Sequence, residues 1–109
     1  MESVRPLRVP PSDPSDAAFV YEPCDDVDVL HVFGELSYGN EAEFESALVS
    51  AVRLSRTTVL DLLGCDFIDA RSLSVIVRAR RALGEKLRIA APESGIVRTV
   101  LTFGGFAFA

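Results

Sequence analysis

Residues 64–83 read GCDFIDARSLSVIVRARRAL, and this stretch decides the fold. The preceding residues, TTVLDLLGC (57–65), form a continuous apolar run typical of a strand buried on both faces of a sheet, and only Asp61 interrupts it. Asp69 stands just before the first apolar residues with helical spacing. Its carboxylate can accept a hydrogen bond from the free backbone N–H of Arg71 or Ser72, so a helix is predicted over residues 70–84 with Asp69 as its N-cap.

Helical spacing divides this helix into two sides. The side predicted to pack on the sheet holds Ser72, Ile76, Ala79 and Leu83, with Leu73 and Val77 beside them, and the opposite side holds Arg71, Ser74, Arg78 and Arg81. Ser72 is therefore expected to be a small, hydrogen-bonded packing residue, and Ser74 to be the more exposed serine. Arg71 opposes the helix dipole, so it is interpreted either as a solvated charge or as a contact to an acidic partner.

The surrounding segments complete an α/β pattern. Residues 17–23 and 27–36 are rich in β-branched and aromatic residues and predict an antiparallel hairpin. Residues 41–55 have helical spacing, with glutamates at the start and arginines at the end. A strand over residues 86–91 and a helix beginning with Pro92 and Glu93 in its first turn follow. The predicted order is ββαβαβα, a single mixed sheet with parallel pairing around the crossovers and helices mainly on one face.

The beginning of the chain differs from the rest. Residues 1–16 carry four of the six prolines and no periodic pattern, so we expect a flexible arm, with the domain covering residues 17–109. The arm has no apolar core of a secretory signal, and no apolar run approaches the roughly 20 residues of a membrane span. We therefore expect a cytoplasmic protein that does not insert into a membrane.

Charge and composition narrow the function classes. The net charge of −5 and the isoelectric point of about 4.7 argue against nucleic-acid binding and favour a protein partner. Cys24 and Cys65 are too few and too far apart for a disulfide scaffold or a zinc site, and we expect no metal or cofactor. His31, in an apolar strand without a second histidine, is interpreted as a packed core residue.

Three segments resemble the STAS domain of bacterial anti-sigma factor antagonists. FGELSYGNEAEFESAL (33–48) resembles the family's Gly-Glu-Leu-Asp segment, VLDLLGCDFIDARSLSVIVRARR (59–81) its central strand and Asp-Ser-Ser/Thr-Gly-Leu signature, and RTVLTFGGF (98–106) its third helix. The resemblance implies a regulator of transcription that binds an anti-sigma factor, itself a serine kinase, and thereby frees a sigma factor. It also implies that phosphorylation at the start of the second helix breaks the complex, because a phosphate adds nearly two negative charges.

Two positions depart from that pattern. Arg71 stands where the family has the phosphorylated serine or threonine, and Ser37 stands where it has an aspartate. Ser72 and Ser74 are the remaining candidates for phosphorylation at the helix start. The full set of predicted partner-binding residues is Ser37, Tyr38, Asp69, Ala70, Arg71, Ser72, Ser74 and Arg78.

Other functions are weighed against this one. A STAS subunit of a lipid-transport ABC complex or of a signalling assembly would use the same helix start. A phosphoaspartate receiver needs a lysine after its last strand, but the only lysine, Lys86, begins a predicted strand, so this function is disfavoured. An enzyme is disfavoured as well, because the sequence shows no paired nucleophile and base. The resemblance also implies a shortened C-terminus, which would leave Phe103, Phe106 and Phe108 partly exposed and predicts a homodimer.

Overall fold

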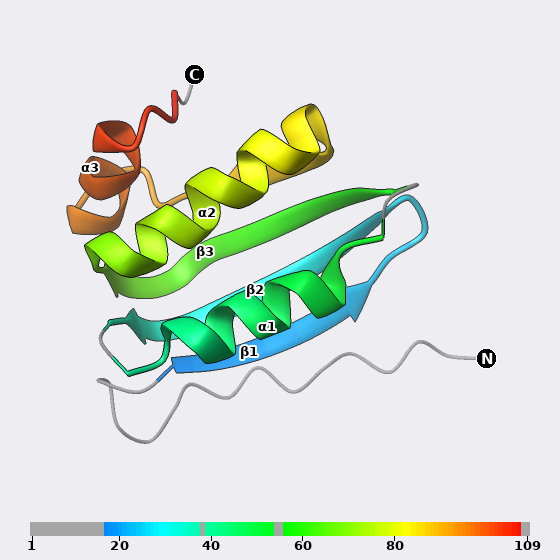
Figure 1. The fold of residues 1–109 in the computed structure, drawn as a ribbon, viewed down its shortest axis with the longest axis horizontal. Coiled ribbons are helices and arrows are strands. Elements are labelled where there is room, and N and C mark those ends of the chain that lie inside the picture. The colour runs from blue at the N-terminus through cyan, green and yellow to red at the C-terminus, as the bar shows by residue number, and fades with distance from the viewer. Residues whose placement is uncertain (1–16, 38, 54–55, 108–109) are drawn as a thin grey trace.

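The computed structural model describes residues 17–37, 39–53 and 56–107. In these residues the elements follow the predicted order ββαβαβα (Figure 1), which confirms the fold class. The elements are β1 (Ala17–Pro23), β2 (Val27–Leu36), α1 (Glu41–Ala51), β3 (Thr57–Ile68), α2 (Ala70–Leu83), a short 3-10 turn η1 (Gly84–Lys86), β4 (Leu87–Ala90) and α3 (Ile96–Phe103).

The four strands form one mixed sheet in the order β1-β2-β3-β4. The β1–β2 hairpin is antiparallel, whereas β2, β3 and β4 run parallel, as the sequence predicts. Alternation along β2 places Leu30 and Val32 in the core and turns His31 to the other face of the sheet. Between β2 and β3 the register shifts after His31 and again after Gly34, which has a φ of 86° and so adopts a conformation that favours glycine.

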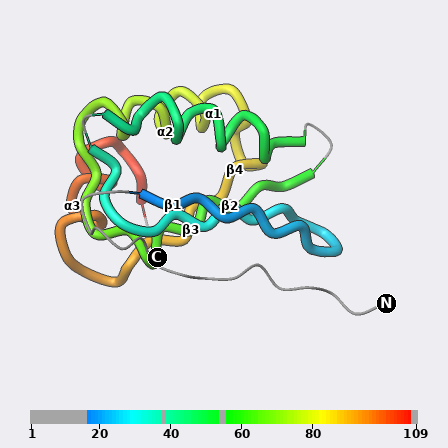
Figure 2. The backbone as a smooth tube through the Cα atoms, turned by 90° about the horizontal axis from the view of Figure 1, so that it is seen from below, coloured from blue at the N-terminus to red at the C-terminus, as the bar shows by residue number. Residues whose placement is uncertain are grey.

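Helices α1 and α2 lie on the same face of the sheet, as Figure 2 shows, and α3 lies at the end of the sheet near the start of α2. Phe44 and Leu48 of α1, and Val75 and Ile76 of α2, are buried against this face. Both helices begin at the edge where β2 and β3 end (Figure 1), so loops and helix starts gather at one edge of the sheet.

Element ends differ from the sequence prediction at several places. The fourth strand spans only Leu87–Ala90, and the prediction that Lys86 begins it is wrong, because Lys86 ends the 3-10 turn η1 that follows α2. Strand β3 continues to Ile68, because its last residues still pair with the end of β2. Helix α1 stops at Ala51, since Val52 is extended; the predicted end at residue 55 falls outside the described residues. The prediction that Pro92 and Glu93 belong to the third helix is wrong, because Gly95, with a φ of 99°, precedes the first helical residue, Ile96.

Residues 1–16 lie outside the described residues, so the flexible arm stays a prediction. Among the described residues, no helix has both the length and the apolar character needed to cross a membrane.

Candidate partner-binding site

The ends of β2 and β3 form the base of the candidate site. Leu36 pairs with Ile68, and the backbone N–H of Asp69 donates to the Leu36 carbonyl oxygen over 2.8 Å. Ser37 follows one strand end and Asp69 the other. The structure therefore brings these two predicted site residues to the same edge of the sheet.

A side chain fixes the loop that contains Ser37. The Ser37 N–H donates to Oδ1 of Asn40 over 3.0 Å, and Nδ2 of Asn40 donates to the Glu35 carbonyl over 2.8 Å. Asn40 stands at the N-cap position of α1 but makes no side-chain hydrogen bond to that helix, because its amide holds the loop. Tyr38 lies outside the described residues.

Asp69 caps α2, as predicted from the sequence. Its Oδ1 accepts a hydrogen bond from the Ser72 N–H over 2.9 Å, and its own backbone is extended. Such a cap contributes about 1 kcal/mol to the stability of the helix. Ala70, the first helical residue, is exposed beside it.

The two serines of α2 have different surroundings. Ser72 is fully buried, as expected, but its hydroxyl has no hydrogen-bond partner among the described residues, so the expectation of a hydrogen-bonded serine is wrong. Ser72 is one of the residues on the buried side of α2, together with Val75 and Ile76. Ser74 is exposed, and its hydroxyl donates to the Ala70 carbonyl over 3.1 Å. Ser74 is therefore the serine of this pair that solvent can reach.

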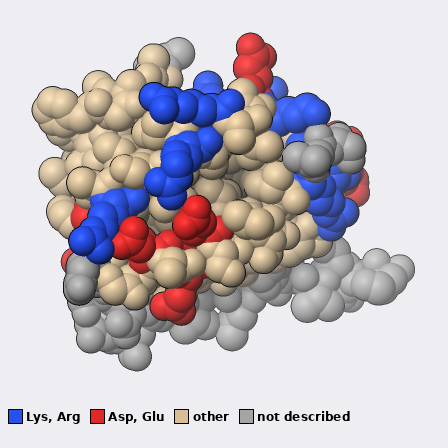
Figure 3. Space-filling model, viewed as in Figure 1, with Lys and Arg blue, Asp and Glu red and all other residues tan. Residues whose placement is uncertain are grey.

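Two arginines of α2 reach across to α1. Nη1 of Arg71 lies 3.2 Å from Oε1 of Glu41, and Nη2 of Arg78 lies 3.3 Å from Oε2 of Glu45. The Arg71 and Arg78 side chains are 61% and 60% exposed, so each pair contributes little stability. Figure 3 shows basic side chains along the surface of the molecule, with acidic side chains beside them.

Sequence reasoning missed a cluster on the opposite face of the sheet. Nδ1 of His31 lies 2.6 Å from Oδ2 of Asp61, and Nε2 lies 2.7 Å from Oε1 of Glu22. His31 is buried as expected, but it bridges two carboxylates instead of packing among apolar side chains alone. The register of β2 with β3 pairs His31 with Asp61, and the sequence carries no local signal for this register.

Cys65 is a buried thiol inside β3, which continues to Ile68. Burial raises the pKa of Cys65 to about 11. Its Sγ lies 3.3 Å from the Phe67 carbonyl oxygen. Among the described residues, no group of three or more histidine, cysteine or acidic side chains is placed to hold a metal ion.

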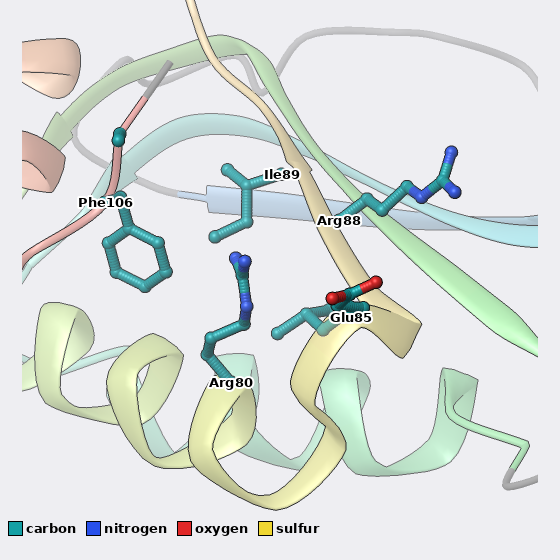
Figure 4. A pocket seen from close by; sticks show the side chains of 7 residues that line it. Arg80, Glu85, Arg88, Ile89 and Phe106 are labelled. Atoms are coloured by element: carbon teal, nitrogen blue, oxygen red, sulfur yellow. The ribbon is translucent and has the colours of Figure 1, made fainter. Parts of the chain in front are cut away.

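A shallow hollow of about 270 Å³ lies along β4. In Figure 4 the Arg80 side chain extends from α2 toward Ile89 and Phe106, and its guanidinium carbon lies 5.8 Å from the centre of the Phe106 ring. Phe106 is only 9% exposed, so the expectation that it is partly exposed is wrong; Phe103 is 84% exposed. The contact holds the segment after α3 against α2.

The chain was compared with protein-family profiles, curated proteins and solved structures. A sequence profile of the STAS domain matches residues 20–108. A search of curated proteins found no match.

Several solved structures are similar. An anti-sigma factor antagonist from Mycobacterium paratuberculosis is 24% identical, with a TM-score of 0.76 over 86% of this chain and 82% of that chain. The anti-sigma factor antagonist SpoIIAA in its unphosphorylated form is 25% identical, with a TM-score of 0.58 over 81% of each chain. The murine Solute Carrier 26 family member A9 anion transporter is 17% identical, with a TM-score of 0.59 over 77% of this chain and 14% of that chain.

Proposed function

The chain belongs to the STAS domain family, and from this premise we propose that it is a cytoplasmic anti-sigma factor antagonist that acts by binding and not by catalysis. In this proposal it sequesters an anti-sigma factor, a serine kinase-like protein, and so releases a sigma factor. The resemblance to anti-sigma factor antagonists in fold and in sequence motifs supports this choice of partner class.

We place the contact surface at the edge where β2 and β3 end. The observation that carries this placement is the hydrogen bond between Asp69 and Leu36, which fixes the start of α2 beside the loop of Ser37. Arg71 projects from this edge with most of its side chain exposed. Together with Ala70, Ser74 and Arg78, it offers a partner a polar surface on which each arginine is paired with a glutamate of α1.

Regulation at this surface differs from the family pattern in our proposal. Arg71 cannot accept a phosphate from a serine kinase, so the complex does not dissociate through modification of that position. Ser72 has no exposed surface, which leaves Ser74 as the accessible serine of the helix start. Ser74 already donates its hydroxyl to the backbone, and a phosphate there would stand between two arginines.

The test is binding to the cognate anti-sigma factor, measured by calorimetry, followed by incubation with ATP and mass spectrometry. We expect binding that ATP does not reverse for the wild type, and a phosphate on residue 71 in Arg71→Ser. Phosphorylation of Ser72 or Ser74 in the wild type, with loss of binding, would contradict the proposal that phosphorylation does not dissociate the complex. Absence of binding to every anti-sigma factor of the source organism would reject the function itself.

A STAS subunit of a larger assembly is the second candidate function. Its support is that the chain also shares its fold with 14% of the length of the anion transporter chain. A pull-down from native extract distinguishes the two, because a lipid-transport or signalling complex would yield a membrane or multidomain partner in place of an anti-sigma factor.

A homodimer is a further part of the proposal. It rests on Phe103, a residue that is 84% exposed, since Phe106 is buried and Phe108 lies outside the described residues. Sedimentation should show a concentration-dependent dimer that Phe103→Ser weakens, and a wild-type monomer at high concentration would contradict it.

A further inference from the structure

Charge separates sharply between the two helices of the covered face. Helix α1 carries three glutamates and no basic residue, whereas α2 carries four arginines and no acidic residue. Glu41 pairs with Arg71 and Glu45 pairs with Arg78, so two successive ion pairs link the two helices.

The series of ion pairs ends where α1 turns apolar. One turn after Glu45, α1 presents Val49, which is 69% exposed. One turn after Arg78, α2 presents the short side chain of Ala82, which lines the same hollow as Val49. Beyond the second ion pair, a hollow therefore separates the side chains of the two helices.

A groove of about 420 Å³ opens at this point. Two charged residues, Glu45 and Arg78, line it together with apolar residues of both helices and of the end of α1. The apolar lining residues are Leu48, Val49, Val52, Val75, Ala79, Ala82 and Leu83.

The charge beside the groove indicates what it binds. Arg81 follows Arg78 by three residues on the exposed side of α2, and in the described part of the chain it makes no ion pair. The one acidic residue that lines the groove, Glu45, is neutralised by Arg78. Arg81 does not line the groove itself but precedes Ala82, which does, so its charge flanks an apolar floor. This combination matches an amphipathic segment with acidic flanks.

We propose that this groove between the second halves of α1 and α2 binds an acidic amphipathic helix of a protein partner. Apolar side chains of the partner helix contact Val49 and Leu83, and a carboxylate pairs with Arg81. The proposal deepens the proposed function, since it assigns part of the partner contact to a surface next to the start of α2, but its test does not require the anti-sigma factor.

The test uses two synthetic 18-residue helical peptides with the same leucine pattern, one flanked by glutamates and one by lysines. Binding to the full chain is followed by fluorescence anisotropy and by amide chemical shifts. The acidic peptide should bind at least about tenfold more tightly and should shift the amides of Val49, Ala82 and Leu83. Equal affinity of the two peptides, or shifts at other surfaces, would overturn the proposal.

Substitutions locate the contact. Val49→Glu should weaken binding of the acidic peptide by about tenfold or more, and Arg81→Glu should reverse the preference between the peptides. Ser46→Glu introduces the same charge on α1 outside the groove and is the matched control. An equal loss of affinity in the control, or amide shifts that change with protein concentration alone, would show that the groove does not hold a partner helix.

The two proposals fail separately. Arg71→Ala should weaken binding to the anti-sigma factor while leaving peptide binding unchanged, because Arg71 lies at the other end of the helix. Val49 and Arg81 are exposed, so the variants should unfold at the wild-type temperature, which thermal scans verify.

Discussion

The imidazole of His31 joins three strands, because Asp61 of β3 lies 2.6 Å from one of its ring nitrogens and Glu22 of β1 lies 2.7 Å from the other. An imidazole with a carboxylate at each nitrogen satisfies both contacts as donors only when it carries a proton on both nitrogens. The His31 side chain is 6% exposed, and those of Asp61 and Glu22 are 17% and 19% exposed. Water can therefore replace the contacts of the two carboxylates only in part if His31 is removed.

Replacing His31 by leucine should therefore destabilise the fold. The two carboxylates would face each other across an apolar side chain, and we expect the free energy of unfolding to fall by about 2–4 kcal/mol in urea titrations at pH 7. The triple variant His31→Leu, Glu22→Gln, Asp61→Asn removes the charges and should recover part of the loss. Stability of His31→Leu within about 0.5 kcal/mol of the wild type would contradict a bridging role.

The buried carboxylate of Asp28 should make stability depend on acid. Burial alone would raise the pKa of Asp28, but hydrogen bonds from Tyr21 and Arg56 and the charge of Arg53 outweigh burial, so the pKa lies below its ordinary value. A lowered pKa gives stability that is present above the ordinary aspartate pKa and is lost as the pH falls through the folded value. Asp28→Asn should lower the free energy of unfolding at pH 7, and its difference from the wild type should shrink below about pH 4.

Urea titrations across this pH range measure the effect. Exposed Asp25→Asn, in the turn next to β2, is the matched control and should show no such pH-dependent difference. If the deficit of Asp28→Asn stays constant down to pH 2.5 (~1.4 units below the ordinary value), the contacts of Asp28 do not stabilise its charged form.

The two thiols should differ in reactivity. Cys24 is exposed, whereas Cys65 is buried and its pKa is raised to about 11, so the reactive thiolate of Cys65 is scarce at neutral pH. Iodoacetamide at pH 8 should modify Cys24 in the native protein and should reach Cys65 only after denaturation, as peptide mapping would show. Rapid native modification of Cys65, with Cys24→Ser as the control protein, would contradict the burial of this strand.

Gly34 should be intolerant of a side chain. Its φ of 86° lies where L-residues are strained, and it stands at the shift in register between β2 and β3. Gly34→Ala should cost about 1–3 kcal/mol of unfolding free energy. A cost near zero in denaturant titrations would mean that the strand relaxes to an ordinary conformation without loss of pairing.

Local signals in the sequence predicted much of the fold and part of the candidate site. Asp69 was identifiable as a cap because capping depends on residues only three apart, and the burial of Ser72 followed from helical spacing. The end of β3 was not identifiable, because its last residues belong to the strand only through their pairing with β2.

Contacts between distant residues escaped the sequence for the same reason. The bridge from His31 to Asp61 depends on a register that the sequence does not encode locally, and the missing partner of the Ser72 hydroxyl depends on which side chains surround it. The start of α3 was misplaced because Pro92 is compatible with a first helical turn, while the conformation of Gly95 decides where that turn begins.

The separation of charge between α1 and α2 has a kinetic consequence. A surface with glutamates along one helix and arginines along the next carries a lateral electric dipole, although the chain as a whole is negative. Such a dipole turns an approaching charged partner into alignment before contact, and dissolved salt screens it over about 10 Å at 0.1 M ionic strength. Association of a partner with this face should therefore slow as salt is added, while the lifetime of the finished complex changes little.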